Sequence, residues 1–239
     1  KNYINIIDPQ TQYMRQRHAS GAWVQDWDSL TNHGTWYGAG YVEGTAWHYS
    51  FFVPHDLPEL ARMVGKELFI QRLEKGFDKG YIDIGNQPNM QAPFIFNHVD
   101  APWLTQKYVR QVLNEQFDLS PLQGWPGEED QGQLGAWYVM ASMGLFQMKG
   151  GCDQNSYYDL TSPLYDKVTI HLDNDYYLGN TFVIETKNNK PGNKYIQSAM
   201  LNGKELKEAR ISHQDIAGGG KLIINLGDTP NRKWGSYKK

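Results

Sequence analysis

One change in hydrophobic spacing constrains the fold of this chain more than any other feature. From Tyr41 to about Gly144, apolar residues recur at the spacing of helix faces. From about Leu160 the spacing becomes two, as in "DKVTIHL" and "KLIINL", which is the pattern of strands that bury one face. The pair Asn202-Gly203 favours a two-residue hairpin turn. The sequence therefore predicts a helical part followed by a small antiparallel, sandwich-like β domain.

The turn-rich segment "GGCDQNSYYDLTSP" separates the two patterns. We therefore assign residues 1–158 to the helical domain and residues 159–239 to the β domain. Capping residues, turn formers and apolar spacing place the helix boundaries within the first domain. The expected helix starts and stops are Tyr41, Gly65, Asp100 and Asp130.

Composition excludes several classes of protein. A net charge of -3 over 239 residues provides no basic surface for nucleic acid. No apolar run approaches the roughly 18 residues that a membrane-spanning helix needs. The single cysteine, Cys152, excludes an internal disulfide bond. Aromatic residues make up 13% of the chain, and we expect some of them to line a cleft for a flat ligand such as a sugar ring.

Three consecutive carboxylates occur in "GWPGEEDQGQLGAWYVM", immediately before an apolar helix pattern. Acidic residues at a helix start interact favourably with the helix dipole, by about 0.3–1 kcal/mol each, and an Asp can cap the first turn. Capping explains one or two of Glu128, Glu129 and Asp130. It explains a third less well because adjacent negative charges repel one another. Capping and chemistry on a ligand both stay open.

Glu43 stands in an unusual setting, "GYVEGTAW", with Tyr41, Trp47 and Tyr49 nearby in sequence. Aromatic rings around a carboxyl group remove it from water and favour its protonated form. Such a group can act as a general acid, whereas the alternative is an ordinary surface acid at a helix start. One enclosed Glu and a second acidic cluster are together what glycoside hydrolysis requires.

The segment "GNQPNMQAPF" carries several neutral oxygen donors, namely Asn86, Gln87, Asn89 and Gln91. Carbonyl and carboxylate oxygens suit a hard cation such as Ca²⁺. A polar turn is the alternative interpretation of the same residues.

Four segments in this order resemble glycoside hydrolase family 92, whose members are calcium-dependent, exo-acting α-mannosidases. They are "YVEGTAWHYSFFVPHDLPEL", "GNQPNMQAPFIFNHVDAPWLTQKYVRQVL", "GWPGEEDQGQLGAWYVMASMGLF" and "SPLYDKVTIHL". The similarity extends from Tyr13 to Gly235. The resemblance implies part of an (α/α)6 helical toroid followed by a small antiparallel β domain.

The resemblance also assigns roles to the candidate residues. It implies that Glu43 is the general acid and Asp130 the general base, with Glu128 as a second candidate for the base. It implies inverting hydrolysis of terminal α-mannosides and a Ca²⁺ ion that engages sugar hydroxyls. The expected metal ligands are Asn86, Gln87 and Asp130.

The chain departs from the family pattern in the block that shapes the site. Where the family has "GNEPSHH", this chain has "GNQPNMQ", with Gln87 in place of the glutamate and Met90 and Gln91 in place of the two histidines. The linkage cleaved therefore stays open. A mannosyl-phosphodiesterase or another toroidal glycosidase is one alternative, and a non-catalytic carbohydrate-binding module is another.

The resemblance covers only the last part of such an enzyme. We therefore expect two partners, a mannose-containing glycan and the preceding portion of the same enzyme. Without that portion, residues 1–239 are expected neither to hydrolyse mannosides nor to stay monomeric. The resemblance implies a secreted, periplasmic or cell-surface location.

Overall fold

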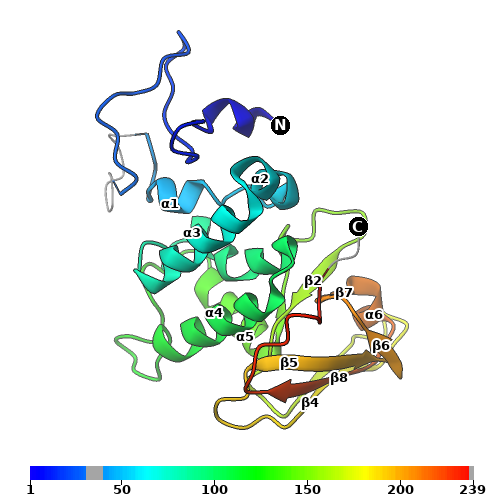
Figure 1. Cartoon of the computed structure of the whole chain (residues 1–239). Coiled ribbons are helices and arrows are strands. Elements are labelled where there is room, and N and C mark those ends of the chain that lie inside the picture. The colour runs from blue at the N-terminus through cyan, green and yellow to red at the C-terminus, as the bar shows by residue number, and fades with distance from the viewer. Residues whose placement is uncertain (31–39, 237–239) are drawn as a thin grey trace. The chain divides into compact units, whose positions relative to one another are not determined.

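A computed structural model describes residues 1–30 and 40–236, which pack as two compact units, Lys1–Ala92 and Pro93–Lys239. The first unit contains helices and irregular segments, and all strands of the described residues belong to the second (Figure 1). The change from helix to strand near residue 158 thus lies inside the second unit, because two helices pack with the sheets that follow them. A domain boundary between residues 158 and 159 stays a prediction.

The first unit is built on two consecutive helices, α2 and α3, that pack against each other. Gly65 separates them with a φ of 92°, as the expected glycine stop requires. Short elements complete the unit. Its elements are η1 (Asn2–Ile6), α1 (Ala46–Tyr49), α2 (Leu57–Val64), α3 (Lys66–Asp78) and η2 (Gln87–Asn89).

The helix expected from Tyr41 is wrong in its start and its length, because α1 is a single turn, Ala46–Tyr49. Glu43 has a φ of 53°, a left-handed conformation that cannot continue a right-handed helix. Thr45 then caps the turn in a capping box, since its hydroxyl accepts from the N–H of Trp47 and its own N–H donates to Nδ1 of His48 at 2.8 Å.

The helices of the second unit start later than the sequence predicts. Ala101 rather than Asp100 precedes α4, and Gly132 rather than Asp130 precedes α5. Gln131 and Gly132 have φ values of 63° and 73°, so the chain becomes right-handed helix only after them. The helices of this unit are η3 (Ala92–Val99), α4 (Pro102–Glu115), α5 (Gln133–Met143) and α6 (His213–Ala217).

The strands of the second unit form two sheets. The smaller has the order β1-β2-β7 and the larger has the order β3-β4-β8-β5-β6. All pairings are antiparallel except that of β4 with β8, which is parallel. The strands are β1 (Leu145–Phe146), β2 (Tyr157–Leu160), β3 (Lys167–His171), β4 (Thr181–Lys187), β5 (Tyr195–Leu201), β6 (Lys204–Leu206), β7 (Arg210–Ser212) and β8 (Gly220–Gly227).

The predicted hairpin is confirmed. Asn202 and Gly203 join β5 to β6 with φ values of 49° and 80°, and Leu201 pairs with Lys204 across the turn. Positive φ at both central residues matches the right-handed twist of the two strands.

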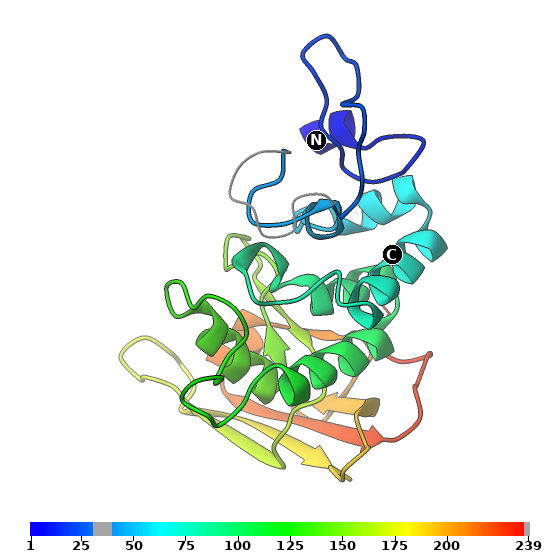
Figure 2. The ribbon, with the colours of Figure 1, turned by 90° about the vertical axis from the view of Figure 1, so that its left-hand side faces the viewer.

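Apolar residues from both sheets form one core, which confirms the sandwich-like packing. Its members are Leu145, Leu160, Phe182, Ile184, Ile196, Ala199, Ala209, Ile211, Ile216, Leu222, Ile224, Leu226 and Trp234. Helix α4 packs against β5 and against α5, so helices and strands of this unit share one folded body (Figure 2). The buried side chain of Gln106 on α4 accepts a hydrogen bond from the N–H of Ile196 at 2.8 Å, where the β5–β8 register shifts.

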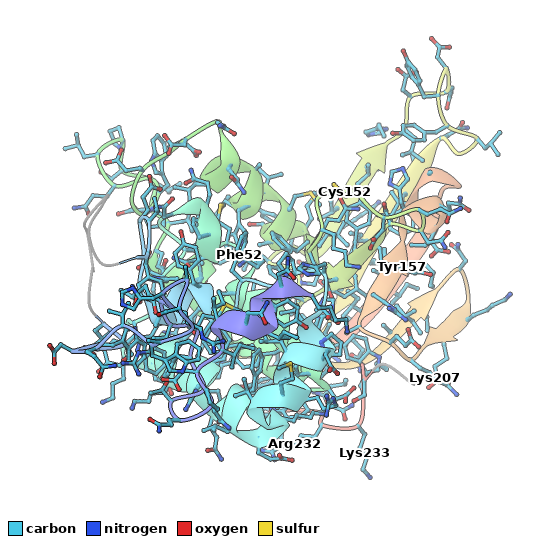
Figure 3. The ribbon with its side chains drawn as sticks, turned by 90° about the horizontal axis from the view of Figure 1, so that it is seen from above. Phe52, Cys152, Tyr157, Lys207, Arg232 and Lys233 are labelled. Atoms are coloured by element: carbon cyan, nitrogen blue, oxygen red, sulfur yellow. The ribbon has the colours of Figure 1, made fainter. Side chains whose placement is uncertain are left out.

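The segment between α5 and β2 contains the chain's single cysteine. Cys152 is exposed, and Tyr157 follows it at the start of β2 (Figure 3). Among the described residues, no helix is both long and apolar enough to cross a membrane.

Candidate active site

Glu43 occupies a strained position in the first unit. Its side chain is half-buried and its backbone has the left-handed φ of 53°, which is uncommon for a residue other than glycine. The following residue, Gly44, allows close approach, because a Cβ there would lie 3.0 Å from Nδ1 of His48. Left-handed conformations at non-glycine residues persist where surrounding contacts impose them and gather at functional sites.

A hydrogen bond joins Glu43 to the "GNQPN" segment. The side-chain amide of Asn86 donates from Nδ2 to Oε2 of Glu43 at 2.8 Å. The Oδ1 atom of the same amide accepts from the backbone N–H of Gln87 at 2.7 Å, which caps η2. The structure thus brings together the predicted acid and two of the predicted metal ligands, all within one unit.

Aromatic residues lie near Glu43, although in a different arrangement from the expected one. The ring of Tyr49 packs against that of Tyr41 with centroids 5.9 Å apart, and its hydroxyl donates to the carbonyl of Val42. Burial raises the pKa of Tyr49, and the negative charge of Glu43 raises it further. Trp47 packs instead against Tyr13 and Tyr81.

The same segment contains two buried polar atoms that have no hydrogen-bond partner within the described part of the chain. They are Nε2 of Gln87 and Oδ1 of Asn89. The nearby amide of Gln91 differs, because its Nε2 donates to the carbonyl of Pro88 at 2.6 Å. A buried polar group without a partner costs about 1–3 kcal/mol, so such atoms often face a ligand, an ion or an ordered water.

Of these two atoms, the amide oxygen of Asn89 fits a calcium ion, whereas the amide nitrogen of Gln87 carries N–H groups and does not bind a cation. No cluster of three or more His, Cys, Asp or Glu residues that could hold a metal occurs in residues 1–30 and 40–236. Amide oxygens are nevertheless accepted ligands of Ca²⁺, and Asn89 offers a buried one that has no partner among the described residues. The sequence indicated Asn89 as an oxygen donor but not as a ligand, because what distinguishes it from its neighbours is a buried oxygen without a partner, which only the folded chain shows.

The acidic block lies in the second unit, and its three carboxylates differ in their contacts. Glu129 accepts hydrogen bonds from the backbone N–H groups of Leu134 at 3.0 Å and Gly135 at 2.8 Å. Glu128 and Asp130 are exposed, and within the described residues their carboxylates make no hydrogen bond or ion pair. Glu129 therefore supplies the capping that the sequence allowed for, and the other two are not needed for it.

An aromatic cavity of about 340 Å³ lies on the α4–α5 connection of the second unit. The ring of Phe117 stacks on that of Trp137 with centroids 5.7 Å apart, and Tyr138 packs against the Phe117 ring with centroids 4.9 Å apart. The cavity is lined by Phe117, Asp118, Leu119, Gly124, Trp125, Gly135 and Tyr138. Its aromatic walls agree with the expectation that some aromatic residues line a cleft.

Comparisons with known proteins agree with these features. Residues 1–228 match a model described as the glycosyl hydrolase family 92 catalytic domain. An uncharacterised secreted glycosidase of Arthroderma benhamiae is 34% identical over 197 residues, covering 81% of this chain and 24% of that protein.

Solved structures show the same fold. A family 92 α-mannosidase from Bacteroides thetaiotaomicron, in complex with mannoimidazole, superposes with a TM-score of 0.85 and 26% identity, covering 97% of this chain and 32% of that one. A family 92 inverting mannosidase from the same organism gives a TM-score of 0.85 and 28% identity, covering 99% of this chain and 34% of that one.

This chain spans about a quarter of the curated relative and about a third of each of these solved chains. Its fold is therefore part of a helical toroid with the β domain that follows it. The family match covers nearly the whole sequence, and it includes both Glu43 and the acidic block. The chain belongs to glycosyl hydrolase family 92.

Proposed function

We propose that the protein containing this chain is an exo-acting α-mannosidase that hydrolyses terminal α-mannosides of glycans with inversion of configuration. The observation that carries the proposal is the hydrogen bond from Asn86 to the half-buried, conformationally strained Glu43. Membership of the family and similarity to solved mannosidases support the choice of substrate.

Glu43 is the general acid in this proposal. Its carboxyl group donates a proton to the glycosidic oxygen as the bond to the anomeric carbon breaks, so the leaving group departs as a neutral alcohol. Its side chain is half-buried and accepts a hydrogen bond from the side-chain amide of Asn86.

Asp130 is the proposed general base, and Glu128 is the second candidate. The base takes a proton from a water molecule that attacks the anomeric carbon from the face opposite the leaving group, which inverts the configuration. Both carboxylates are exposed and neither is used in capping α5.

Calcium is the proposed cofactor, and when bound it would supply positive charge to sugar hydroxyls. Gln87 and Asp130 stay proposed ligands, and Asn89 joins them because its Oδ1 atom is buried without a partner in the described residues. These side chains orient the sugar through oxygen and amide groups, while Glu43 donates the proton to the leaving oxygen.

The proposal concerns the whole protein. Its partners would be a mannose-containing glycan and a preceding portion of the same enzyme, since solved relatives are about three times as long as the region they share with this chain. A secreted, periplasmic or cell-surface location belongs to the same proposal, and a curated relative is described as secreted.

The test compares leaving groups in the whole protein. Glu43→Gln should lower activity on unactivated α-mannosides by about 10²–10⁴-fold, because general acid catalysis is lost. Aryl mannosides with very good leaving groups need no protonation and should lose far less. Equal losses on both substrate types would reject Glu43 as the acid.

The same assays separate the alternatives. Preference for a mannose-phosphate linkage over a mannose-alcohol linkage would indicate a mannosyl-phosphodiesterase, and preference for another sugar would indicate a different toroidal glycosidase. Binding of mannosides without turnover would indicate a non-catalytic carbohydrate-binding module. Each of these results would contradict the α-mannosidase proposal.

A further inference from the structure

Three hydrogen bonds define the orientation of the Asn86 side-chain amide, and the longest, at 3.5 Å, runs from its Nδ2 to the backbone carbonyl of Glu43. The backbone N–H of Gln87 can only donate, so the amide atom that faces it at 2.7 Å must be the oxygen. The nitrogen is then the atom that faces Oε2 of Glu43 at 2.8 Å. The orientation follows from the network, because exchanging the two atoms would set one donor against another and leave Glu43 facing an oxygen.

This arrangement restrains Glu43 from an element distant in sequence. The donor comes from the cap of η2, and the acceptor lies in the loop before α1. The η2 turn is itself fixed, because Asn89 and Met90 donate backbone hydrogen bonds back to Asn86 and Gln87. The amide of Asn86 is therefore held firmly enough to position the carboxyl group that it contacts.

The hydrogen bond also restricts where Glu43 can carry the acidic proton. An N–H donor occupies Oε2, so a proton on the lone pair that faces Asn86 would oppose it. Within the described residues, Oε1 makes no hydrogen bond, which leaves it open to the glycosidic oxygen. Asn86 thus favours Oε1 as the oxygen that donates the proton.

We propose that Asn86 is a positioning residue for the general acid and not a calcium ligand. This proposal rests on the proposed function, since it needs Glu43 to act as the acid. Asn86 presents its N–H group to Glu43, and its oxygen is engaged by the cap of η2. The side-chain oxygens left for a cation in this segment are those of Gln87, Asn89 and Gln91.

The substitution Asn86→Asp separates the two roles. Aspartate keeps the oxygen that accepts from the Gln87 N–H and is as good a cap as asparagine, so the turn should be retained. It replaces the N–H donor to Glu43 with a carboxylate oxygen. It also adds a negative charge, which would strengthen a direct calcium ligand.

The expected result in the whole protein has two parts. Asn86→Asp should lower kcat on unactivated α-mannosides by about 10²-fold, because the acid is misplaced, with a much smaller loss on substrates with good leaving groups. KM should change little. Calcium affinity, measured by calorimetric titration in the absence of substrate, should not tighten.

Asn86→Ala provides the second variant. It removes the N–H donor without adding charge, so it should reproduce the dependence on leaving group in weaker form while leaving calcium affinity unchanged. Thermal unfolding of both variants would show that they remain folded. Asn89→Ala is the matched comparison within the same turn, and it should weaken calcium binding without any dependence on leaving group.

Two results would overturn the proposal. If Asn86→Asp binds calcium more tightly and keeps its activity, or if Asn86→Ala loses calcium, then Asn86 is a ligand. If the Asn86 variants lose the same activity on substrates with good and with poor leaving groups, then Asn86 does not act through Glu43. Glu43→Gln tells failure of the positioning role apart from failure of the proposed function. If Glu43→Gln loses more activity on poor leaving groups and the Asn86 variants do not, only the positioning role is rejected. If Glu43→Gln shows no such dependence on the leaving group, both the positioning role and the role of Glu43 as acid are rejected.

Discussion

The carboxylate of Glu129 accepts a hydrogen bond from the backbone N–H of Gly135 at 2.8 Å, in the first turn of α5. The same carboxylate accepts from Leu134, so one side chain satisfies two of the backbone groups that a helix start leaves unpaired. Its neighbours Glu128 and Asp130 are exposed and take no part in this cap. Structural and chemical roles are thereby divided among three adjacent carboxylates.

The capping role of Glu129 can be tested by measuring the free energy of unfolding. Glu129→Ala should lower the free energy of unfolding by about 0.5–2 kcal/mol, because a capping acceptor is lost. Glu128→Gln, five positions before the same helix, should change it by less than about 0.5 kcal/mol. Chemical denaturation of both variants would test this. Equal destabilisation would mean that the cap is shared.

The roles of the two free carboxylates can be measured as activity. Asp130→Asn should remove most hydrolysis for good and poor leaving groups alike, because water activation is needed whatever departs. Glu128→Gln should retain more activity if Asp130 is the base. The reverse order, with Glu128→Gln the more damaging variant, would exchange their assignments.

Removal of calcium should abolish hydrolysis of mannosides, and added Ca²⁺ should restore this activity. Because Oδ1 of Asn89 is buried with no partner in the described residues, Asn89→Ala should raise the calcium concentration needed for half-maximal binding. Isothermal titration with Ca²⁺ would give this value independently of turnover. Unchanged activity in excess chelator would remove the metal from the mechanism.

Asp8 should contribute to stability in a pH-dependent way. Burial alone would raise its pKa, but hydrogen bonds from the Gln10 N–H, Arg15 and Thr11 outweigh burial and lower the pKa below its usual value. The ionised form therefore stabilises the folded state above the unfolded pKa of about 4, and this contribution is lost as pH falls through the lower folded pKa.

Asp8→Asn should accordingly lower the free energy of unfolding by about 1–3 kcal/mol at neutral pH, because the buried Asp8 carboxylate no longer pairs with the half-buried Arg15 at 2.9 Å. The difference in unfolding free energy between the two proteins should become smaller as the pH is lowered toward the pKa of Asp8 in the folded state. Unfolding curves recorded at several pH values would test it, with the exposed Glu67→Gln as a control. A loss independent of pH would exclude the ionisation of Asp8 as its cause.

The link between α4 and the β5 strand gives a further test of packing. Gln106→Leu keeps the side-chain volume but leaves the buried N–H of Ile196 without its acceptor, which should cost about 1–3 kcal/mol. Gln111→Leu on the same helix removes only an exposed hydrogen bond to Glu115 and should cost much less. Similar losses would show that the Gln106 bond contributes little.

Several elements were determined by the sequence alone, because their causes act over a few neighbouring residues. Asn202-Gly203 specifies its turn through backbone conformations that most residues avoid, and Gly65 ends a helix for the same reason. Alternation with period two predicts strands with one buried face, and the structure confirms them. The order of the motifs also sufficed to predict the family.

Only the tertiary structure decided the features that join distant residues. Local pattern predicted a helix through Glu43 and a cap at Asp130, whereas packing imposes a left-handed Glu43 and moves the cap to Glu129. The Glu43–Asn86 hydrogen bond and the parallel pairing of β4 with β8 join segments that are not neighbours in sequence. Such contacts depend on how whole elements pack, which hydrophobic period and local propensity do not encode.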